Sequence, residues 1–178
     1  MHPRIRELLD HLDAERAVLR EAFEEVPPEL RERAPAPGRW SVAGIIEHLA
    51  MVEQRVAGAL AEKIAAARAE GVGPDTADGP VLPSLDLTRI RTRATRVNAP
   101  ERSHPTGLPA DAAWQALERA GEAVRETLRS GDGLALGSIE HSHPLFGSIS
   151  LYHWFAILGS HEARHAAQIR EDAVTAQA

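Results

Sequence analysis

Hydrophobic residues at three- and four-residue spacing constrain the fold of this chain more than any other feature of the sequence. The spacing recurs over four stretches, and we expect helices at about residues 3–25, 41–69, 111–129 and 149–174. Alternating runs of Val, Ile, Thr and aromatic residues, which would indicate strands, are nearly absent. The sequence therefore predicts an all-α protein, and 178 residues suit a single domain over residues 1–178.

Proline, glycine and serine mark the ends of these helices. Pro27-Pro28 ends the first helix, Ser41 fits the N-cap of the second, and Ser130-Gly-Asp-Gly ends the third. Residues 71–109 are rich in proline and glycine, with a possible short helix at residues 87–94. A connection of this length indicates a crossover between distant helices, and we expect it to cover a site as well.

Composition excludes several classes of function. The chain has no cysteine, so disulfides, thiolate ligands and a cysteine nucleophile are ruled out. Its formal net charge is −6 and its arginines are scattered among acidic residues, which argues against nucleic acid as a partner. The sequence has no apolar run of the roughly 20 residues that cross a membrane, and its N-terminus lacks a signal-peptide pattern. We therefore expect no membrane insertion and a cytoplasmic location.

A pair of histidines in the last predicted helix is the first candidate for chemistry. His161 and His165 lie one helical turn apart, on a stripe that also carries Trp154 and Leu158, so both should face inward. Such pairs also occur by chance, and a metal site needs a third ligand from another element. His48, beside the apolar stripe of the second helix, is available, although a lone buried histidine more often bonds a backbone carbonyl.

Other polar residues near these histidines are weaker candidates. Glu47 and Glu162 neighbour possible ligands in sequence and should point about 100° away from them, which suits surface charge or support of a ligand better than general-base catalysis. Gln168 lies one turn beyond His165 and is better placed to orient a ligand or water, although packing or capping is the commoner role. Arg164 is a further possible helper.

Two polar groups lie on predicted loops. His141 and His143 precede the last helix and are expected at the surface, within reach of a site mouth. Arg89, Arg91, Arg93 and Arg96 lie close together in the crossover; a solvated segment is the commoner explanation, and anchoring of an anionic substrate is the alternative.

Three segments together resemble the DinB-like superfamily of four-helix-bundle metalloproteins, which includes the YfiT-like enzymes. They are Trp40-Ser-Val-Ala-Gly-Ile-Ile-Glu-His48-Leu, His143-Pro-Leu-Phe-Gly147, and the stretch from Trp154 through His161-Glu-Ala-Arg-His165-Ala-Ala-Gln-Ile. The resemblance covers nearly the whole chain. It implies a four-helix bundle with a long crossover between helices 2 and 3, a homodimer, and one divalent metal ion bound by His48, His161 and His165. The family name comes from damage induction and implies no DNA binding.

The resemblance leaves the activity open. A metal on three imidazoles lowers the pKa of a bound thiol or water, and nitrogen ligands suit zinc, nickel, iron or copper. We expect an enzyme that transfers a low-molecular-weight thiol, such as bacillithiol or mycothiol, to a small electrophile. One alternative is hydrolysis of a small amide or ester at the same site; the other is a non-catalytic metal- or ligand-binding stress or interaction protein.

Overall fold

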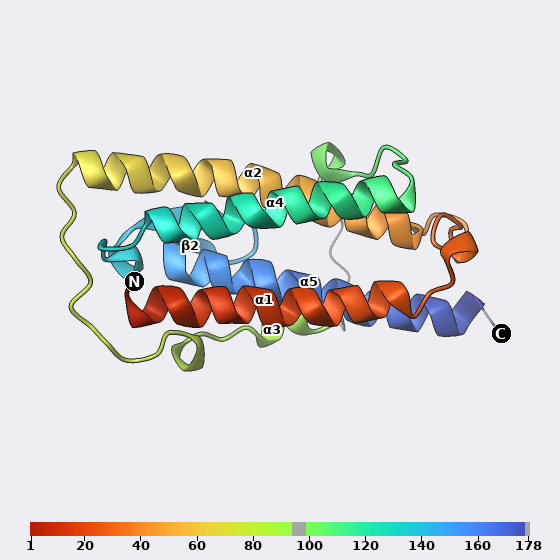
Figure 1. The fold of residues 1–178 in the computed structure, drawn as a ribbon, viewed down its shortest axis with the longest axis horizontal. Helices are drawn as coiled ribbons and strands as arrows, with labels where there is room; N and C mark the ends of the chain where they lie inside the picture. Colours follow the sequence, from red (N-terminus) through yellow and green to blue (C-terminus); the bar gives the residue numbers. More distant parts are fainter. Residues whose placement is uncertain (94–98, 177–178) are drawn as a thin grey trace.

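Four long helices form the body of the protein. The computed structural model describes residues 1–93 and 99–176, in which the long helices are α1 (Pro3–Glu24), α2 (Val42–Ala69), α4 (Ala110–Ser130) and α5 (Leu151–Ala176). They lie side by side, with α1 and α5 running one way and α2 and α4 the other (Figure 1). The predicted all-α four-helix bundle is confirmed in its main features. None of the helices in these described ranges is long and apolar enough to cross a membrane.

The helix ends follow local chemistry. The Ser41 hydroxyl accepts a hydrogen bond from the Gly44 N–H at 3.1 Å, so Ser41 is the N-cap of α2, as predicted. Gly131 follows the last residue of α4, within the predicted stop signal. A single turn of 3-10 helix, η1 (Pro28–Leu30), lies in the link between α1 and α2. Each of these ends is set by residues close by in the sequence.

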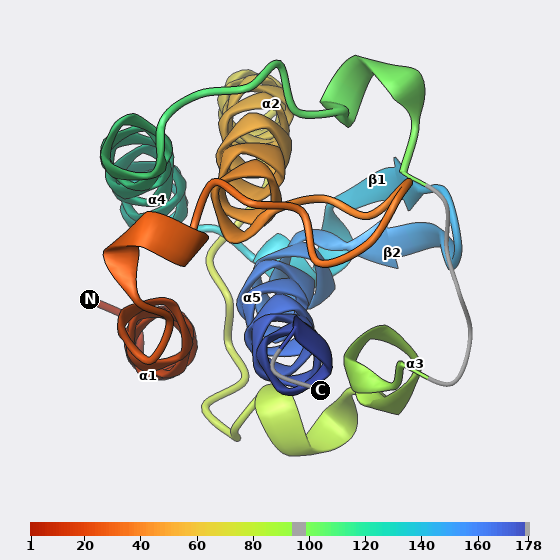
Figure 2. The ribbon, with the colours of Figure 1, turned by 90° about the vertical axis from the view of Figure 1, so that its right-hand side faces the viewer.

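The crossover, residues 71–109, explains why α2 and α4 are parallel. It runs back along the bundle from the end of α2 to the level where α2 begins (Figure 1). It contains η2 (Leu82–Ser84), α3 (Thr88–Arg91) and η3 (Glu101–Ser103). The short helix α3 packs against α5 (Figure 2). Residues 94–98, which include Arg96, lie outside the described residues.

A β-hairpin departs from the expectation of a loop before the last helix. Strand β1 (Glu140–His143) pairs antiparallel with β2 (Gly147–Ser150), after a 3-10 turn η4 (Leu136–Ser138). The strand-forming signal is weak, because Ile149 is the main β-branched residue in either strand. Packing on α5 supports the hairpin instead: the indole N–H of Trp154 donates to the His141 carbonyl at 3.0 Å. Helix α5 consequently begins at Leu151 rather than at residue 149.

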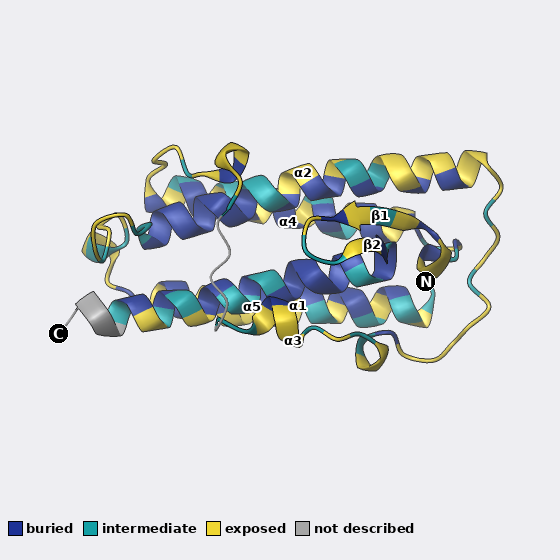
Figure 3. Cartoon of the chain, turned by 180° about the vertical axis from the view of Figure 1, so that it is seen from behind, coloured by how far each residue is buried: buried dark blue, intermediate teal, exposed yellow. Residues whose placement is uncertain are grey.

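The buried core consists of two apolar clusters, one toward each end of the bundle. The buried residues lie on the inward sides of the long helices (Figure 3). On every long helix the boundary between the clusters falls at a residue that is not a large hydrophobe. These residues are Arg16 on α1, Glu53 on α2, Gly121 on α4 and Glu162 on α5. A layer of buried charge therefore divides the core.

Candidate metal centre

Three histidines from two helices converge between α2 and α5. His48 lies in the second turn of α2, while His161 and His165 project from the middle of α5. Their ring centroids are 4.6 to 5.5 Å apart. One ring nitrogen from each lies within 4.8 Å of the others. The structure thus brings together the three residues selected from the sequence. The two on α5, His161 and His165, lie near the middle of that helix.

Hydrogen bonds orient two of the three rings. His48 Nδ1 lies 2.8 Å from the Ser103 carbonyl oxygen, so this nitrogen carries the proton and donates. His165 Nδ1 lies 3.0 Å from Gln168 Oε1, which also accepts from Arg93 at 3.2 Å and is therefore the amide oxygen. Both Nε2 atoms consequently keep free lone pairs. Gln168 thus contacts the ring of His165, while its role toward a ligand stays a prediction.

The spacing of the nitrogens suits a shared transition-metal ion. His161 Nε2 and His165 Nε2 lie 3.1 Å apart. Two nitrogens held about 2.0–2.1 Å from one ion, at tetrahedral or octahedral angles, are about 2.8–3.4 Å apart. The donor set is nitrogen only, which suits zinc, nickel, iron or copper better than calcium or magnesium. The residues present therefore fit such an ion.

Burial keeps the three imidazoles neutral. Burial is the largest cause of the lowered pKa of His48. Burial also lowers the pKa of His161 to about 3, and the neighbouring His48 adds to that shift. The pKa of His165 is also well below its usual value, for the same reason. Neutral imidazole is the form that binds metal. His161 is only half-buried, so the cluster keeps one side near solvent.

Comparison with known proteins identifies the family and the fold of the chain. The sequence pattern of the DinB superfamily matches residues 11–169, which is most of the chain. The chain belongs to the DinB superfamily. A crystal structure of TT2238, described as a four-helix bundle protein, is similar in fold, with a TM-score of 0.57 and 20% sequence identity over 94% of this chain and 98% of that one. No curated protein sequence matches the chain.

In this DinB-superfamily protein the crossover packs against His48, one member of the histidine cluster. Ser103, which accepts from His48, belongs to η3 in the crossover. Trp40, just before α2, places its ring 5.0 Å from that of His48 and 5.7 Å from that of His104 in the crossover. His48 is therefore enclosed by the crossover on one side and by an indole ring on another.

Glu47 is a structural anchor, which corrects its expected place at the surface. It is 3% exposed, and its carboxylate accepts four hydrogen bonds at 2.6 to 3.0 Å from the backbone N–H groups of Thr106, Gly107 and Leu108 and from the Thr106 hydroxyl. Burial raises the pKa of Glu47, but these bonds outweigh it and lower the pKa overall. Glu47 thus ties the end of the crossover to α2, beside His48.

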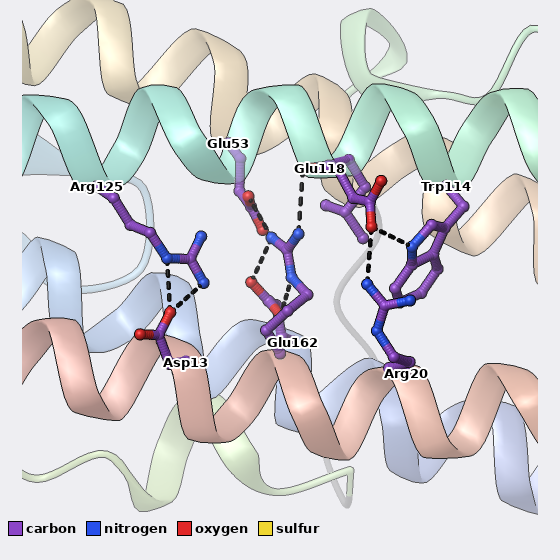
Figure 4. A network of polar contacts seen from close by, with 9 residues as sticks. Asp13, Arg20, Glu53, Trp114, Glu118, Arg125 and Glu162 are labelled. Carbon is purple, nitrogen blue, oxygen red and sulfur yellow. Dashed lines mark hydrogen bonds and ion pairs between the residues drawn. The ribbon is translucent and has the colours of Figure 1, made fainter.

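Glu162 is likewise buried, at 2% exposure, and faces away from the histidines. It accepts two hydrogen bonds from the Arg16 guanidinium at 2.8 and 2.9 Å, and Arg16 also reaches Glu53 at 2.8 Å and the Leu117 carbonyl at 3.2 Å (Figure 4). We call Arg16, Glu53 and Glu162 the polar layer; it connects all four long helices. Sequence reasoning missed Arg16 and Glu53. The available signal was a charged residue within each apolar stripe.

The arginines of the crossover hold it against the bundle. Arg164 on α5 donates to the Thr92 and Ile90 carbonyls, and so faces the crossover as well. The anionic-substrate hypothesis loses support, because the described arginines have protein partners: Arg89 with the Leu145 carbonyl, Arg91 with Glu15, and Arg93 with Glu171.

His141 and His143 lie on strand β1, whereas a surface loop was expected for both. His143 is buried rather than at the surface, with its ring 4.6 Å from that of Trp154, while His141 is half-buried. Burial is the main cause that lowers the pKa of His143 to about 4. His143 Nδ1 accepts the Leu145 N–H at 3.1 Å, so it is not positioned as a ligand through this atom. The two residues pack the hairpin onto α5.

Proposed function

We propose that this protein binds one divalent transition-metal ion through His48, His161 and His165 and transfers a low-molecular-weight thiol to a small electrophile. The observation that supports the proposal is the convergence of three neutral imidazoles within 4.8 Å, with the Nδ1 of His48 and of His165 already hydrogen bonded. In the transfer, the thiol loses its proton to solvent, its sulfur forms a bond to an electrophilic carbon, and the bond from that carbon to its leaving group breaks, so that the leaving group departs with the electron pair.

The chain's own residues would prepare the site for this chemistry. Ser103 and Gln168 hold the His48 and His165 rings with Nε2 toward the centre. The covering crossover limits water, and the half-buried His161 leaves an open side for substrate. A divalent ion in this position would lower the pKa of a coordinated thiol.

The neighbouring carboxylates favour thiol transfer over hydrolysis. Glu47 is saturated by four hydrogen bonds and Glu162 is paired with Arg16, so neither is free to take a proton from water. A thiol, with an ordinary pKa of about 8.5, needs less help to ionise than water at about 15.7. The cytoplasmic location and the homodimer expected from the sequence belong to this proposal and await tests of their own.

Metal content is the first test. Untagged protein should contain about one zinc, nickel, iron or copper ion per chain by elemental analysis, and His48→Ala or His161→Ala should remove most of it. His2→Ala, which removes a histidine outside the cluster, is the matched control and should keep the metal. Equal metal content in all four proteins would refute the site.

Activity is the second test. The metal-loaded protein is incubated with cysteine, glutathione, bacillithiol or mycothiol together with an activated aryl halide, and thioether formation is followed by mass spectrometry. We expect product that requires the metal and is lost in His161→Ala. Cleavage of nitrophenyl esters or anilides without thioether would favour a hydrolase. Inactivity in both assays with metal bound would favour a non-catalytic binding protein.

A further inference from the structure

Arg93, in the crossover, contacts the histidine cluster through one intermediate side chain. Its Nη1 donates to Gln168 Oε1 at 3.2 Å, and the same oxygen lies 3.0 Å from His165 Nδ1. The crossover also contacts the cluster directly, where the Ser103 carbonyl lies 2.8 Å from His48 Nδ1. The contact at His165 differs in kind, because it passes through an amide, and an amide has a donor end and an acceptor end.

The orientation of this amide decides which nitrogen of His165 carries the proton. A guanidinium has N–H donors and no acceptor, so the Gln168 atom that faces Arg93 is the oxygen. The same oxygen faces Nδ1, which must then carry the proton and donate. Nε2 keeps its lone pair, as metal binding requires. In the opposite orientation the amide NH2 would donate to Nδ1, and the proton would sit on Nε2 and block the ligand position.

Without Arg93, the opposite orientation would satisfy its hydrogen bonds equally well. His161 Nε2 lies 3.1 Å from His165 Nε2, so a proton on either of these atoms can bond the other. Gln168 is half-buried, and water both donates and accepts, so it can bond either end of the amide. Only a partner that donates and cannot accept separates the two arrangements. Among residues 1–93 and 99–176, Arg93 is that partner.

A neighbouring carboxylate balances the charge of Arg93. Its Nε donates to Glu171 Oε2 at 2.7 Å, so the guanidinium contacts Gln168 as one half of an ion pair. An unpaired cation would repel a divalent ion nearby, whereas an ion pair does so much less. A hydrogen bond from a charged donor is also roughly twice as strong as a neutral one. Arg93 can therefore fix the amide without opposing the metal.

We propose that Arg93, acting through Gln168, is a positioning residue that holds the His165 proton on Nδ1 and so keeps Nε2 free for the metal ion. The proposal rests on the three-histidine metal site of the proposed function. It extends that function by assigning control of metal affinity to a residue of the crossover, 75 residues from Gln168 in the sequence.

The proton position is measured first, in metal-free protein, by nitrogen NMR of the imidazole rings, with His165 assigned from His165→Ala. The original protein should carry the His165 proton on Nδ1. Arg93→Met removes the donor and keeps a side chain of similar reach, so a population with the proton on Nε2 should appear. Arg93→Lys, which again donates without accepting, should suppress that population. Arg89→Met is the matched control, because this crossover arginine donates to the Leu145 carbonyl; it should leave the proton on Nδ1.

Zinc affinity is the second measurement, by competition with a chelator. Arg93→Met should weaken zinc binding by about tenfold, as expected for the loss of a group that orients a metal ligand. Arg89→Met should change it by less than about twofold. Gln168→Glu supplies a carboxylate that accepts from Nδ1 in any orientation, so in this background Arg93→Met should no longer weaken zinc binding. A merely structural role of Arg93 would weaken it in both backgrounds.

Four outcomes would overturn the proposal. They are an unchanged proton position in Arg93→Met, the same change in Arg89→Met, no recovery in Arg93→Lys, and weaker zinc binding from Arg93→Met in the Gln168→Glu background. The melting temperatures of the variants would show that each folds. Absence of zinc binding by the original protein would instead refute the metal site, and the two failures are distinct because the proton position is read without metal.

Discussion

At the scale of single residues, Glu53 is the most unusual ionisable group of the polar layer. Burial and the nearby Glu162 carboxylate raise its pKa well above the usual value, and Arg16 offsets this only in part. One of its oxygens, Oε1, is buried without a partner. Burial therefore favours the protonated form of Glu53, and Arg16 makes two hydrogen bonds to Glu162 and one to Glu53.

The raised pKa of Glu53 predicts how stability depends on pH. A raised folded-state pKa stabilises the protein fully below the unfolded pKa of about 4.5, and that stability is lost as pH rises toward the folded pKa. Glu53→Gln removes the titrating group and keeps its shape. The free energy of unfolding of the variant should therefore rise relative to that of the original protein as pH increases above about 4.5. Urea unfolding at several pH values between about 5 and 8 measures the difference. Parallel stability curves would contradict the prediction.

At the scale of elements, α4 approaches α1 closely at Gly121. A Cβ atom built there would lie 2.7 Å from an Arg16 guanidinium nitrogen, and Arg16 is fixed by both carboxylates of the polar layer. Gly121→Ala should therefore destabilise the protein by about 1–3 kcal/mol, despite the better helix propensity of alanine.

Gly58, inside α2, is the matched control. A Cβ there has no neighbour within 4 Å. Gly58→Ala should leave stability unchanged or raise it by up to about 1 kcal/mol. Chemical denaturation of both variants separates close packing from propensity; a neutral Gly121→Ala would show that Arg16 can move aside.

Glu47 on α2 fixes the end of the crossover through its hydrogen bonds. In the original protein the donors of the crossover bond both carboxylate oxygens of Glu47, whereas Glu47→Gln offers them only one acceptor oxygen. We therefore expect the variant to lose about 1–3 kcal/mol in unfolding free energy. Hydrogen exchange of the Thr106, Gly107 and Leu108 amides should also become faster. Glu62→Gln, at an exposed position of the same helix, is the control and should change neither quantity.

At the scale of the whole molecule, the polar layer connects all four long helices and separates the two apolar clusters. A buried ion pair is weak evidence for stability, because desolvation offsets attraction, but losing one partner leaves charge unpaired. Arg16→Met should therefore cost about 3–5 kcal/mol.

The combined Arg16→Met, Glu53→Leu and Glu162→Leu variant should instead be about as stable as the original protein, or up to about 4 kcal/mol more stable. Equilibrium unfolding of the two variants under one set of conditions makes the comparison. If the triple variant loses as much as Arg16→Met alone, the layer contributes net stability rather than fixing how the helices align.

Local chemistry in the sequence determined the four helices, because a helix bonds its own backbone and shows its buried side at a period of 3.6 residues. Ser41 and Gly131 mark helix ends for the same reason, and His161 and His165 share a face. Only the tertiary structure decided which distant groups meet. Arg16 finds Glu53 37 residues away and Glu162 146 residues away, and no local spacing encodes such pairs. The hairpin of β1 and β2 likewise depends on its packing against α5. Glu47 is buried because the crossover passes over it and donates hydrogen bonds to it.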